Sequence, residues 1–374
     1  MSEHKGLELR STITEDGKLK LNLEEVSVGA PAADEIVVRV EAAPINPSDL
    51  GLLLGPAKLS TMESGGSEDR PEVTADLIEG GMGGVKARVG QSMPVGNEGA
   101  GTVVAAGDDV QDMMGKQVGM MGGAMYAQYR KVKARDAIVL PDDASAEDGA
   151  SMFVNPLTSL AFTEQMKMDG FKGLVHTAAA SNLGQMLNKI CLADGIPLVN
   201  IVRKEEQVKI LKDIGAPIVI NSSEPDFMPK LIDSIAETEA YLAFDAVGGG
   251  KLAGQILTAM EAASQRSMTE YSRYGSDQAK QVYLYGVLDT SPTVLERGFG
   301  MAWSIGGWLL PHFLGRAGME TALRMRSRVK DELKTTFASS YTQTISLAEA
   351  LKPDTIRAYQ SKSTGEKYLI DPTK

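Results

Sequence analysis

The first third of the chain alternates apolar and polar positions in short runs that end at Gly, Asp or Pro. This two-residue period is typical of β-strands, and the residues between the runs are those that favour turns. The runs are LKLNLEEV (19–26), EIVVRVEAAPI (35–45), GTVVAAG (101–107) and QVGMMGG (117–123). They predict a compact β-rich domain at the start of the chain.

Residues 55–94 interrupt this pattern. The segment is rich in glycine and polar residues, and its one weakly helical run is EVTADLIEG (72–80). A long insertion of this composition is usually either a functional lid or a disordered connector. The sequence leaves both interpretations open.

From Leu157 onward, helical periods alternate with short apolar runs, which predicts a parallel sheet wound with helices. The apolar runs are LVHTAAA (174–180), PLVNIV (197–202), PIVIN (217–221), AYLAFDAVG (240–248) and QVYLYG (281–286). Helices are expected over LGQMLNKICLADG (183–195) and RKEEQVKILKDIG (203–215). An apolar stretch with two tryptophans, MAWSIGGWLLPHFL (301–314), a long helix and a last strand, KYLIDP (367–372), close the sequence. The predicted fold class is therefore α/β.

Composition narrows the class of protein. The 374 residues, 43% hydrophobic and 23% charged, are enough for two domains with a large core. The formal charge of −11 argues against binding to nucleic acid or to an anionic membrane surface. The one cysteine, Cys191, lies in the apolar run MLNKICLA and is expected to be buried. The charged N-terminus has no apolar signal region, and no run approaches the ~18 apolar residues of a membrane helix, so a cytoplasmic location is expected.

The segment VHTAAASNLGQ (175–185) has the strand–turn–helix context of a dinucleotide-binding turn but few of its glycines. Such turns usually read G-x-G-x-x-G, whereas here Ala179 and Ser181 take the first two places and Gly184 the third. Small side chains and a helix that starts near Asn182 would let a phosphate approach free N–H groups. The alternative is an ordinary small-residue turn of an α/β protein.

The end of the second parallel strand indicates which dinucleotide this turn would hold. An acidic residue there binds the ribose 2′-hydroxyl of NAD, whereas an arginine accommodates the 2′-phosphate of NADP. This chain reads VNIVRKEE, so Arg203 and Lys204 occupy the tip. Two cations favour NADPH as the cofactor, and the alternative is a solvated helix start.

Several segments resemble the medium-chain dehydrogenase/reductase superfamily in its zinc-free quinone oxidoreductase and enoyl reductase branches. AAPINPSDL (42–50) resembles the family's V-N-P-S-D loop, PVGNEGAGTVVAAG (94–107) its P-x-x-G-x-E-x-x-G-x-V segment, and FVNPLTSLAF (153–162) its N-P-x-T-A segment. The same order continues through VHTAAASNLGQ, NIVRKEEQVKILKDIGAPIVIN (200–221) and FDAVGG (244–249). The resemblance covers most of the chain from Val37 to about Gly286.

The resemblance implies a GroES-like β-rich catalytic domain that faces a Rossmann domain, with the nicotinamide in the cleft. The first domain is expected over 1–156 and 312–374, and the Rossmann NADP-binding domain over 157–311. By analogy, Asn46 would face the substrate, while Asn155 and Thr158 would flank the nicotinamide; these three are the candidate catalytic residues. A turn role for Asn46 before Pro47 is the alternative, and Ser48 and Asp49 are expected to cap the following helix. The implied cofactor-binding residues are Asn155, Thr158, Ala180, Ser181, Asn182, Leu183, Gly184, Arg203, Lys204, Val247, Gly248, Gly286 and Lys367.

No metal is expected. Zinc-containing members of the superfamily place cysteine, histidine and cysteine where this chain has Asn46, Asn97 and, close by, Asn155. Zinc prefers thiolate, imidazole or carboxylate ligands, and the chain has one distant cysteine. The three histidines, His4, His176 and His312, are scattered and are expected to be structural.

Without zinc, the chemistry that fits best is hydride transfer to an acceptor already polarised by conjugation, such as a quinone or another conjugated carbonyl compound. Two alternatives remain: a trans-2-enoyl thioester reductase, or a catalytically weak protein that binds NADPH. Enoyl thioester reductases of this type carry a tyrosine soon after the N-P-S-D segment, and this chain has none before Tyr126, which is expected to be a packed strand residue. The expected partners are a small-molecule substrate and, from the family, a second copy of the chain that pairs edge strands of the Rossmann sheet.

Overall fold

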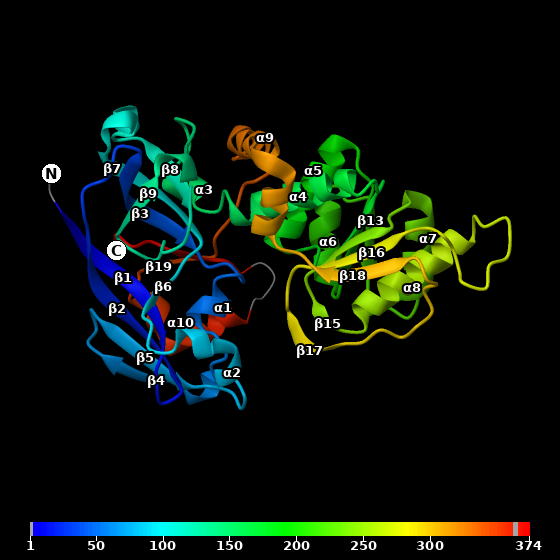
Figure 1. Cartoon of the computed structure of the whole chain (residues 1–374), viewed down its shortest axis with the longest axis horizontal. Coiled ribbons are helices and arrows are strands. Elements are labelled where there is room, and N and C mark those ends of the chain that lie inside the picture. Colours follow the sequence, from blue (N-terminus) through cyan, green and yellow to red (C-terminus); the bar gives the residue numbers. More distant parts are fainter. Residues whose placement is uncertain (1–2, 362–365) are drawn as a thin grey trace. The chain divides into compact units, whose positions relative to one another are not determined.

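The structure is a computed structural model that describes residues 3–361 and 366–374, and it divides the chain into two compact units (Figure 1). The first unit comprises Met1–Val154 and Arg328–Lys374, and the second comprises Asn155–Ser327. The sequence places the return of the chain to its first domain near residue 312. That position falls inside α9 (Leu310–Asp331), a helix interrupted by a kink at Gly318, and the unit boundary lies near its end.

The first unit is built on two sheets. One has the strand order β4-β5-β2-β1-β6, and the other has the order β10-β8-β7-β3-β20-β19, with β9 also paired to β3. The strands are β1 (His4–Ile13), β2 (Lys18–Val28), β3 (Glu35–Pro44), β4 (Glu63–Gly66), β5 (Pro71–Asp76), β6 (Met93–Pro94), β7 (Glu98–Ala106), β8 (Gln117–Met121), β9 (Tyr129–Lys133), β10 (Ala137–Val139), β19 (Gln343–Ile345) and β20 (Tyr368–Ile370). Its short helices are α1 (Leu50–Leu53), α2 (Met82–Val85), α3 (Ala146–Gly149), α10 (Pro353–Gln360) and the 3₁₀ turns η1 (Leu59–Thr61), η2 (Lys86–Arg88), η3 (Asp108–Met113), η4 (Ala134–Asp136) and η5 (Glu349–Leu351).

Alternation of side chains builds the core of this unit. On β2, Leu19, Leu21 and Leu23 are buried while the residues between them are partly exposed. The C-terminal strand β20 pairs antiparallel with β3, so the end of the chain completes a sheet begun by the first 44 residues. The four strands predicted here are confirmed, whereas β1, which pairs with β2 over ten residues, is an additional strand.

The insertion 55–94 is part of this architecture. The run EVTADLIEG, interpreted as weakly helical, instead contains β5, which pairs with both β2 and β4 and extends the sheet. The helical prediction is wrong because the exposed edge of β2 offers a full row of main-chain partners, which outweighs a weak local preference. Helix α2 follows this hairpin.

The second unit holds a six-stranded parallel sheet of order β13-β12-β11-β14-β16-β18. Its strands are β11 (Leu174–Thr177), β12 (Leu198–Val202), β13 (Ile218–Asn221), β14 (Leu242–Asp245), β16 (Lys280–Leu284) and β18 (Trp303–Gly307), and a separate pair joins β15 (Gly248–Gly250) to β17 (Asp289–Thr293). The helices are α4 (Val154–Met168), α5 (Asn182–Asp194), α6 (Glu205–Asp213), α7 (Phe227–Thr238) and α8 (Leu252–Gln265), followed by α9. Five predicted strands and both predicted helices are present.

Helices cover both faces of this sheet (Figure 1). Alternate strand residues point to opposite faces: Leu174 packs in a cluster with side chains of α4 and α5, and Val175 packs in a cluster with side chains of α7 and α8. Cys191 is buried on the α5 face, as predicted. Burial on both faces explains why the strands read as continuous apolar runs. The α/β fold class, with a GroES-like unit and a Rossmann unit, is confirmed.

None of the helices within residues 3–361 and 366–374 combines the length and apolar character that a bilayer crossing requires.

Candidate functional site

The carboxyl ends of four neighbouring strands in the second unit collect most of the predicted cofactor residues at one edge of the sheet. In the order β12-β11-β14-β16, these ends lead into Arg203–Lys204, the turn 178–184, Val247–Gly248 and Gly286. In open α/β sheets, ligands bind outside this edge where the direction of winding reverses. The reversal here lies between β11 and β14, the first and fourth strands of the sheet along the chain.

The turn after β11 is tightly built from small residues. Ala179 and Ala180 are buried, and the Ala179 N–H donates to Ile201 O at 3.2 Å, which holds the turn against the end of β12. Ser181 is the N-cap of α5, and its hydroxyl accepts the Gly184 N–H at 3.2 Å. A Cβ on Gly184 would lie 2.2 Å from Ala179 O. Glycine is therefore retained where the helix touches the turn.

The left-handed conformation that this turn needs falls on Ala178, one residue before the first motif position, with φ of 51°. Alanine adopts this region at a cost of about 1–2 kcal/mol. Asn182 is partly exposed and Leu183 is 9% exposed at the start of α5. The turn thus forms with Ala179 and Ser181 at the first two motif positions, and its one left-handed residue is an alanine, Ala178.

Asp245, at the end of β14, shapes the next loop. It is fully buried and accepts hydrogen bonds from Thr177 Oγ1 at 2.6 Å, Val247 N at 2.9 Å and Gly248 N at 3.2 Å. Thr177 Oγ1 in turn accepts the Ala246 N–H at 2.8 Å. This network ties the loop 246–248 to β11, so the main chain that lines the site is held rigidly.

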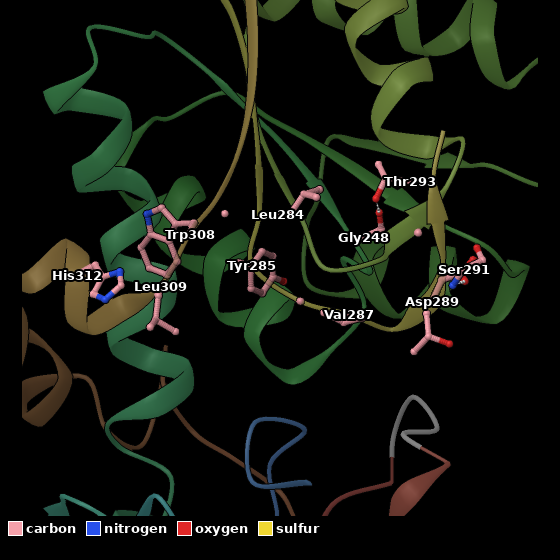
Figure 2. A pocket seen from close by; sticks show the side chains of 14 residues that line it. Gly248, Leu284, Tyr285, Val287, Asp289, Ser291, Thr293, Trp308, Leu309 and His312 are labelled. Atoms are coloured by element: carbon pink, nitrogen blue, oxygen red, sulfur yellow. Dashed lines mark hydrogen bonds between the residues drawn. The ribbon is translucent and has the colours of Figure 1, made fainter. Parts of the chain in front are cut away.

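A cavity of about 500 Å³ lies against this loop. Figure 2 shows Asp289, Ser291 and Thr293 at one side of it and Trp308, Leu309 and His312 at the other. Gly248 and Gly286 form part of the lining, and a Cβ on Gly286 would lie 2.6 Å from Ala246 O. Thr293 Oγ1 donates to Gly248 O at 2.7 Å, which closes one wall.

Tyr285 lines the cavity and also contacts β11. Its hydroxyl lies 2.7 Å from His176 Nε2. Burial lowers the pKa of His176 to about 3, so the imidazole is neutral at pH 7, and burial also raises the pKa of Tyr285. A neutral His–Tyr pair holds the ring in place, in keeping with the structural role expected for His176.

The tip of β12 carries the two predicted cations, both exposed. Lys204 forms an ion pair with Glu206, with Nζ and Oε1 3.3 Å apart. The charge of Arg203 lies close enough to Asp289 to lower the pKa of that cavity-lining carboxyl, after the larger effect of the hydrogen bonds from Ser291. Arg203 therefore acts electrostatically on a residue that lines the cavity.

Asn155 and Thr158 belong to the first turns of α4 in the second unit. Asn155 is partly exposed, and Thr158 is 7% exposed. A contact from Thr158 to a bound cofactor would therefore need its small remaining exposed surface.

The two other candidates, Asn46 and Lys367, lie in the first unit beside Glu98. Glu98 is fully buried and accepts hydrogen bonds from Asn46 Nδ2 at 2.7 Å, Phe153 N at 2.8 Å and Val154 N at 2.9 Å. Burial raises the pKa of Glu98, and the charge of Lys367 and these donors partly offset the rise. Asn46 is 1% exposed and its amide is engaged inside the protein, whereas the resemblance implied that it would face the substrate. Its carbonyl oxygen accepts the Asp49 N–H at 2.9 Å, which fits the alternative of a turn role.

Lys367 lies in this polar cluster and is not simply solvated. Its Nζ donates to Ser151 Oγ at 2.7 Å and lies 5.2 Å from the centre of the Tyr341 ring. Ser151 Oγ is also 2.7 Å from the Tyr341 hydroxyl. Burial lowers the pKa of Lys367 to about 8, although Glu98 and Asp49 act in the opposite direction.

Asp49 has a different role from the predicted helix cap. Its carboxylate accepts the Asn46 N–H and the Asn97 N–H, each at 2.8 Å, and makes no side-chain bond to α1. Burial raises the pKa of Asp49 to about 7, although these two N–H groups lower it. The carboxyl group of Asp49 thus joins two motif loops and does not cap α1.

Sequence reasoning assigned no role to Glu98, Ser151, Tyr341 or Asp245. Glu98 lies in the segment 94–107 and Asp245 in the segment 244–249, both of which resemble family motifs. An acidic residue in a glycine-rich, otherwise apolar segment is the sequence signal that could have pointed to each of them. Ser151 and Tyr341 are 190 residues apart, and only the fold brings them together. Tyr126, expected to be a packed strand residue, is fully buried but lies in the loop before β9, and its hydroxyl donates to Pro44 O at 3.0 Å.

In the part of the chain that the structure describes, no group of three or more His, Cys, Asp and Glu side chains is placed to hold a metal ion.

The fold, together with the residues collected at the carboxyl ends of the parallel strands, defines a two-domain α/β protein with a Rossmann-type sheet and a GroES-like β unit. No protein-family model matches the chain. The mitochondrial enoyl-[acyl-carrier-protein] reductase of Xenopus tropicalis is 29% identical over 238 residues, which are 61% of this chain and 60% of that protein. The chain thus spans about 60% of the length of this curated relative.

Solved structures match over nearly the whole chain. A putative NADPH:quinone reductase from Mesorhizobium loti is 27% identical, with a TM-score of 0.70 and coverage of 100% of this chain and 99% of that one. The quinone oxidoreductase of Escherichia coli, solved in complex with NADPH, is 18% identical, with a TM-score of 0.67 and coverage of 99% and 100%. The predicted resemblance to the quinone oxidoreductase and enoyl reductase branches of the medium-chain dehydrogenase/reductase superfamily is confirmed.

Proposed function

We propose that this chain is an NADPH-dependent oxidoreductase that transfers hydride to a quinone or another conjugated carbonyl acceptor. The observation that carries the proposal is the exposed Arg203–Lys204 pair at the tip of β12, beside a turn of small residues and a glycine-lined cavity. The names of similar structures, NADPH:quinone reductase and quinone oxidoreductase, support the same reading.

The residues at the sheet edge fit a dinucleotide. Gly184 and Gly286 stand where a Cβ would lie 2.2 Å and 2.6 Å from main-chain oxygens, so only glycine allows this close main-chain packing. The small side chains at 178–181 would let a phosphate approach the main chain at the start of α5. Arg203 would hold the 2′-phosphate in a charge-assisted contact, with Lys204 adding charge.

When bound, the dihydronicotinamide supplies a hydride, two electrons with one hydrogen nucleus, to the electrophilic carbon of the acceptor. Residues of the chain would orient the two reactants and exclude water. Negative charge then grows on the acceptor oxygen, where hydrogen-bond donors stabilise it. A proton from a side chain or from water completes the reduction. Conjugation already polarises the acceptor, so we propose that no zinc is required.

Arg203→Ala tests the cofactor assignment. The affinity for NADPH, measured by fluorescence titration, is expected to fall about 10- to 100-fold because a charge-assisted contact is lost, while the affinity for NADH stays within about twofold. Arg266→Ala is the matched control, since Arg266 is an exposed cation of the same unit that pairs with Asp233. Equal losses for NADPH and NADH, or no loss, would refute the assignment.

The second candidate function is reduction of a trans-2-enoyl thioester, and the curated relative named as an enoyl-[acyl-carrier-protein] reductase favours it. Comparing NADPH oxidation with quinones and with an enoyl-thioester acceptor separates the two readings. Faster turnover with the thioester would reverse our order of preference.

The third candidate is a protein that binds NADPH without turnover. Tight binding of NADPH together with no oxidation over a panel of quinones, enones and enoyl thioesters would establish it.

We further propose a homodimer formed through β18, the strand at the edge of the six-stranded sheet. Its flanks carry exposed apolar side chains, with Met301 72% and Leu309 54% exposed. Light scattering on the full chain tests this proposal, and a monomer would contradict it. A cytoplasmic location is proposed from the sequence, and cell fractionation tests it against an organelle.

A further inference from the structure

A second cavity in the Rossmann unit, of about 310 Å³, lies at the amino ends of β12 and β13, between the C-terminal half of α5 and the end of α7. The proposed cofactor residues lie at the opposite, carboxyl edge of the same sheet. Apolar side chains, among them Leu192, Ile196 and Ile218, form most of the lining. Pockets for small molecules have volumes of roughly 300–1,000 Å³, so this cavity suits a ligand of few atoms.

Asn188, on α5, is a buried polar residue of this lining, and its amide is held in one orientation. Asn188 Oδ1 accepts a hydrogen bond from Asn200 Nδ2 at 3.2 Å, and the same Nδ2 donates to Ile218 O at 3.0 Å. A main-chain oxygen can only accept, so Asn200 must present its N–H groups on this side, and Asn188 must turn its oxygen toward them. The Asn188 Nδ2 group therefore points away from Asn200.

The Asn188 Nδ2 group has no hydrogen-bond partner within residues 3–361 and 366–374. Asn188 is 1% exposed, so bulk water does not take the place of a partner. Buried polar groups are almost always hydrogen-bonded, because an unpaired donor carries the full cost of leaving water. Apolar pockets orient their ligands through a few polar groups of this kind. The unpaired amide therefore points to a ligand that brings an acceptor.

Two residues at the end of α7 restrict the chemistry of this ligand. Glu237 lines the cavity and is exposed, so its negative charge opposes an anion. Thr238 also lines the cavity, but its hydroxyl already donates to Ser234 O at 2.6 Å and does not compete with Asn188 as a donor. The ligand that fits is a neutral molecule whose acceptor reaches Asn188 and whose remaining surface is apolar.

We propose that this cavity binds a small neutral molecule with an apolar body and one carbonyl oxygen, which accepts a hydrogen bond from Asn188 Nδ2. Leu192, which lines the cavity and is 44% exposed, lies where the ligand enters. The site goes beyond the proposed function, because its residues are separate from the cofactor residues and its ligand takes part in no hydride transfer.

The test uses two probes of nearly the same shape, cyclohexanone and methylenecyclohexane, of which the second lacks the oxygen. Their dissociation constants are measured by ligand-observed NMR on the full chain, with and without NADPH. The wild type is expected to bind the ketone about 3- to 10-fold more tightly than the alkene, which is the effect of one neutral hydrogen bond. In Asn188→Leu this ratio should fall to within about twofold. Asn200 keeps its bond to Ile218 O in this variant, so the fold is expected to persist.

Leu192→Trp provides a second variant, because a larger side chain at the entrance fills the cavity. It should weaken the binding of both probes at least about fivefold. Leu323→Trp is the matched control, since Leu323 is a 55% exposed leucine on α9 of the same unit, and it should leave both affinities unchanged. If Asn188→Leu does not fold, the ratio of the two probes in the wild type and the loss in Leu192→Trp still decide the inference.

Equal affinities of the wild type for the two probes would overturn the inference, and so would binding that Leu192→Trp leaves intact. Displacement of both probes by NADPH would also overturn it, because they would then occupy the cofactor edge. Binding of neither probe up to its solubility limit would mean that the cavity takes solvent alone. No measurement here depends on turnover, so a chain that reduces no acceptor would refute the proposed function and leave this test unaffected.

Discussion

Gly184 provides the most direct test of how the cofactor turn is built. The glycine lies in the first turn of α5, and a Cβ on it would lie 2.2 Å from Ala179 O, 2.6 Å from Ala179 C and 2.8 Å from Ala179 Cα. All three are main-chain atoms of a fully buried residue. The Ala179 N–H is bonded to Ile201 O, so the turn can move away only by loosening its contact with β12.

The magnitude follows from this geometry. Gly184→Ala must open the closest contact from 2.2 Å to roughly 3 Å, the shortest distance that real Cβ atoms show. Forcing extra volume into a packed site costs about 1–3 kcal/mol, and the better helix propensity of alanine recovers up to about 1 kcal/mol. We therefore expect the free energy of unfolding to fall by about 1–2 kcal/mol. In a unit of this size, that corresponds to a decrease in Tm of about 2–8 °C.

The assay can isolate the second unit because both tryptophans, Trp303 and Trp308, belong to it. Thermal unfolding is followed by tryptophan fluorescence, and NADPH binding is measured by titration, with affinity expected to fall about 10-fold as the turn is displaced. Gly315→Ala is the control, since Gly315 lies in α9, is exposed and has no atom within 4 Å of an added Cβ. If Gly184→Ala unfolds at the same temperature as Gly315→Ala and binds NADPH normally, the close-contact account of this turn is refuted.

Two further predictions concern buried charges. Lys280 and Glu261 form a buried ion pair, 1% exposed at each residue, with Nζ and Oε2 2.7 Å apart. Lys280→Met is expected to lower the free energy of unfolding, measured by chemical denaturation, by about 3–5 kcal/mol, because Glu261 would be left as a buried carboxylate without its cation. A smaller loss in the double variant Lys280→Met/Glu261→Gln would attribute the cost to that unpaired carboxylate. Burial raises the pKa of Asp49 from 3.8 to about 7, so its contribution to stability is present at low pH and is lost as pH rises through this window, with a slope approaching about 1.4 kcal/mol per pH unit. Unfolding curves of Asp49→Asn should lack this decline between about pH 4 and 7, and an unchanged decline would assign it to another group.

The parallel sheet could be predicted because the local sequence pattern is enough to identify five of its strands. Strands buried on both faces are mostly apolar, as in PLVNIV, where Asn200 is the one polar residue, and they stand between turn residues and amphipathic helices. The run EVTAD was misread because its Glu, Ala and Asp favour a strand only weakly, and its pairing partners β2 and β4 lie far away or across an exposed turn. The additional strand β1 carries charged residues at Lys5, Glu8 and Arg10, which hid its alternation.

Some residues of the candidate site could likewise be predicted from local sequence, and others could not. Arg203, the turn 178–184 and Gly286 follow predicted strands directly, so the topology of a parallel sheet is enough to collect them at one edge. The cluster around Glu98 has no such local rule. Lys367 contacts Ser151, 216 residues earlier in the chain, because β20 joins the sheet of β3. The spacing of these two residues in the sequence does not predict that contact.

The structure also separates residues that a motif alone treats as equivalent. Asn46 and Asn97 are both asparagines in glycine- or proline-containing loops, and both main chains are held by Asp49. Their side chains differ in what lies next to them: Asn46 meets the buried carboxylate of Glu98, which consumes its donor, whereas Asn97 meets the exposed hydroxyl of Ser48. Removing the Asn46 amide would take one donor from a buried carboxyl group that also accepts two main-chain N–H groups, and the loss of that donor would lower the free energy of unfolding. The same residue type therefore packs around a buried carboxyl group in one loop and lies exposed at the surface in the adjacent loop.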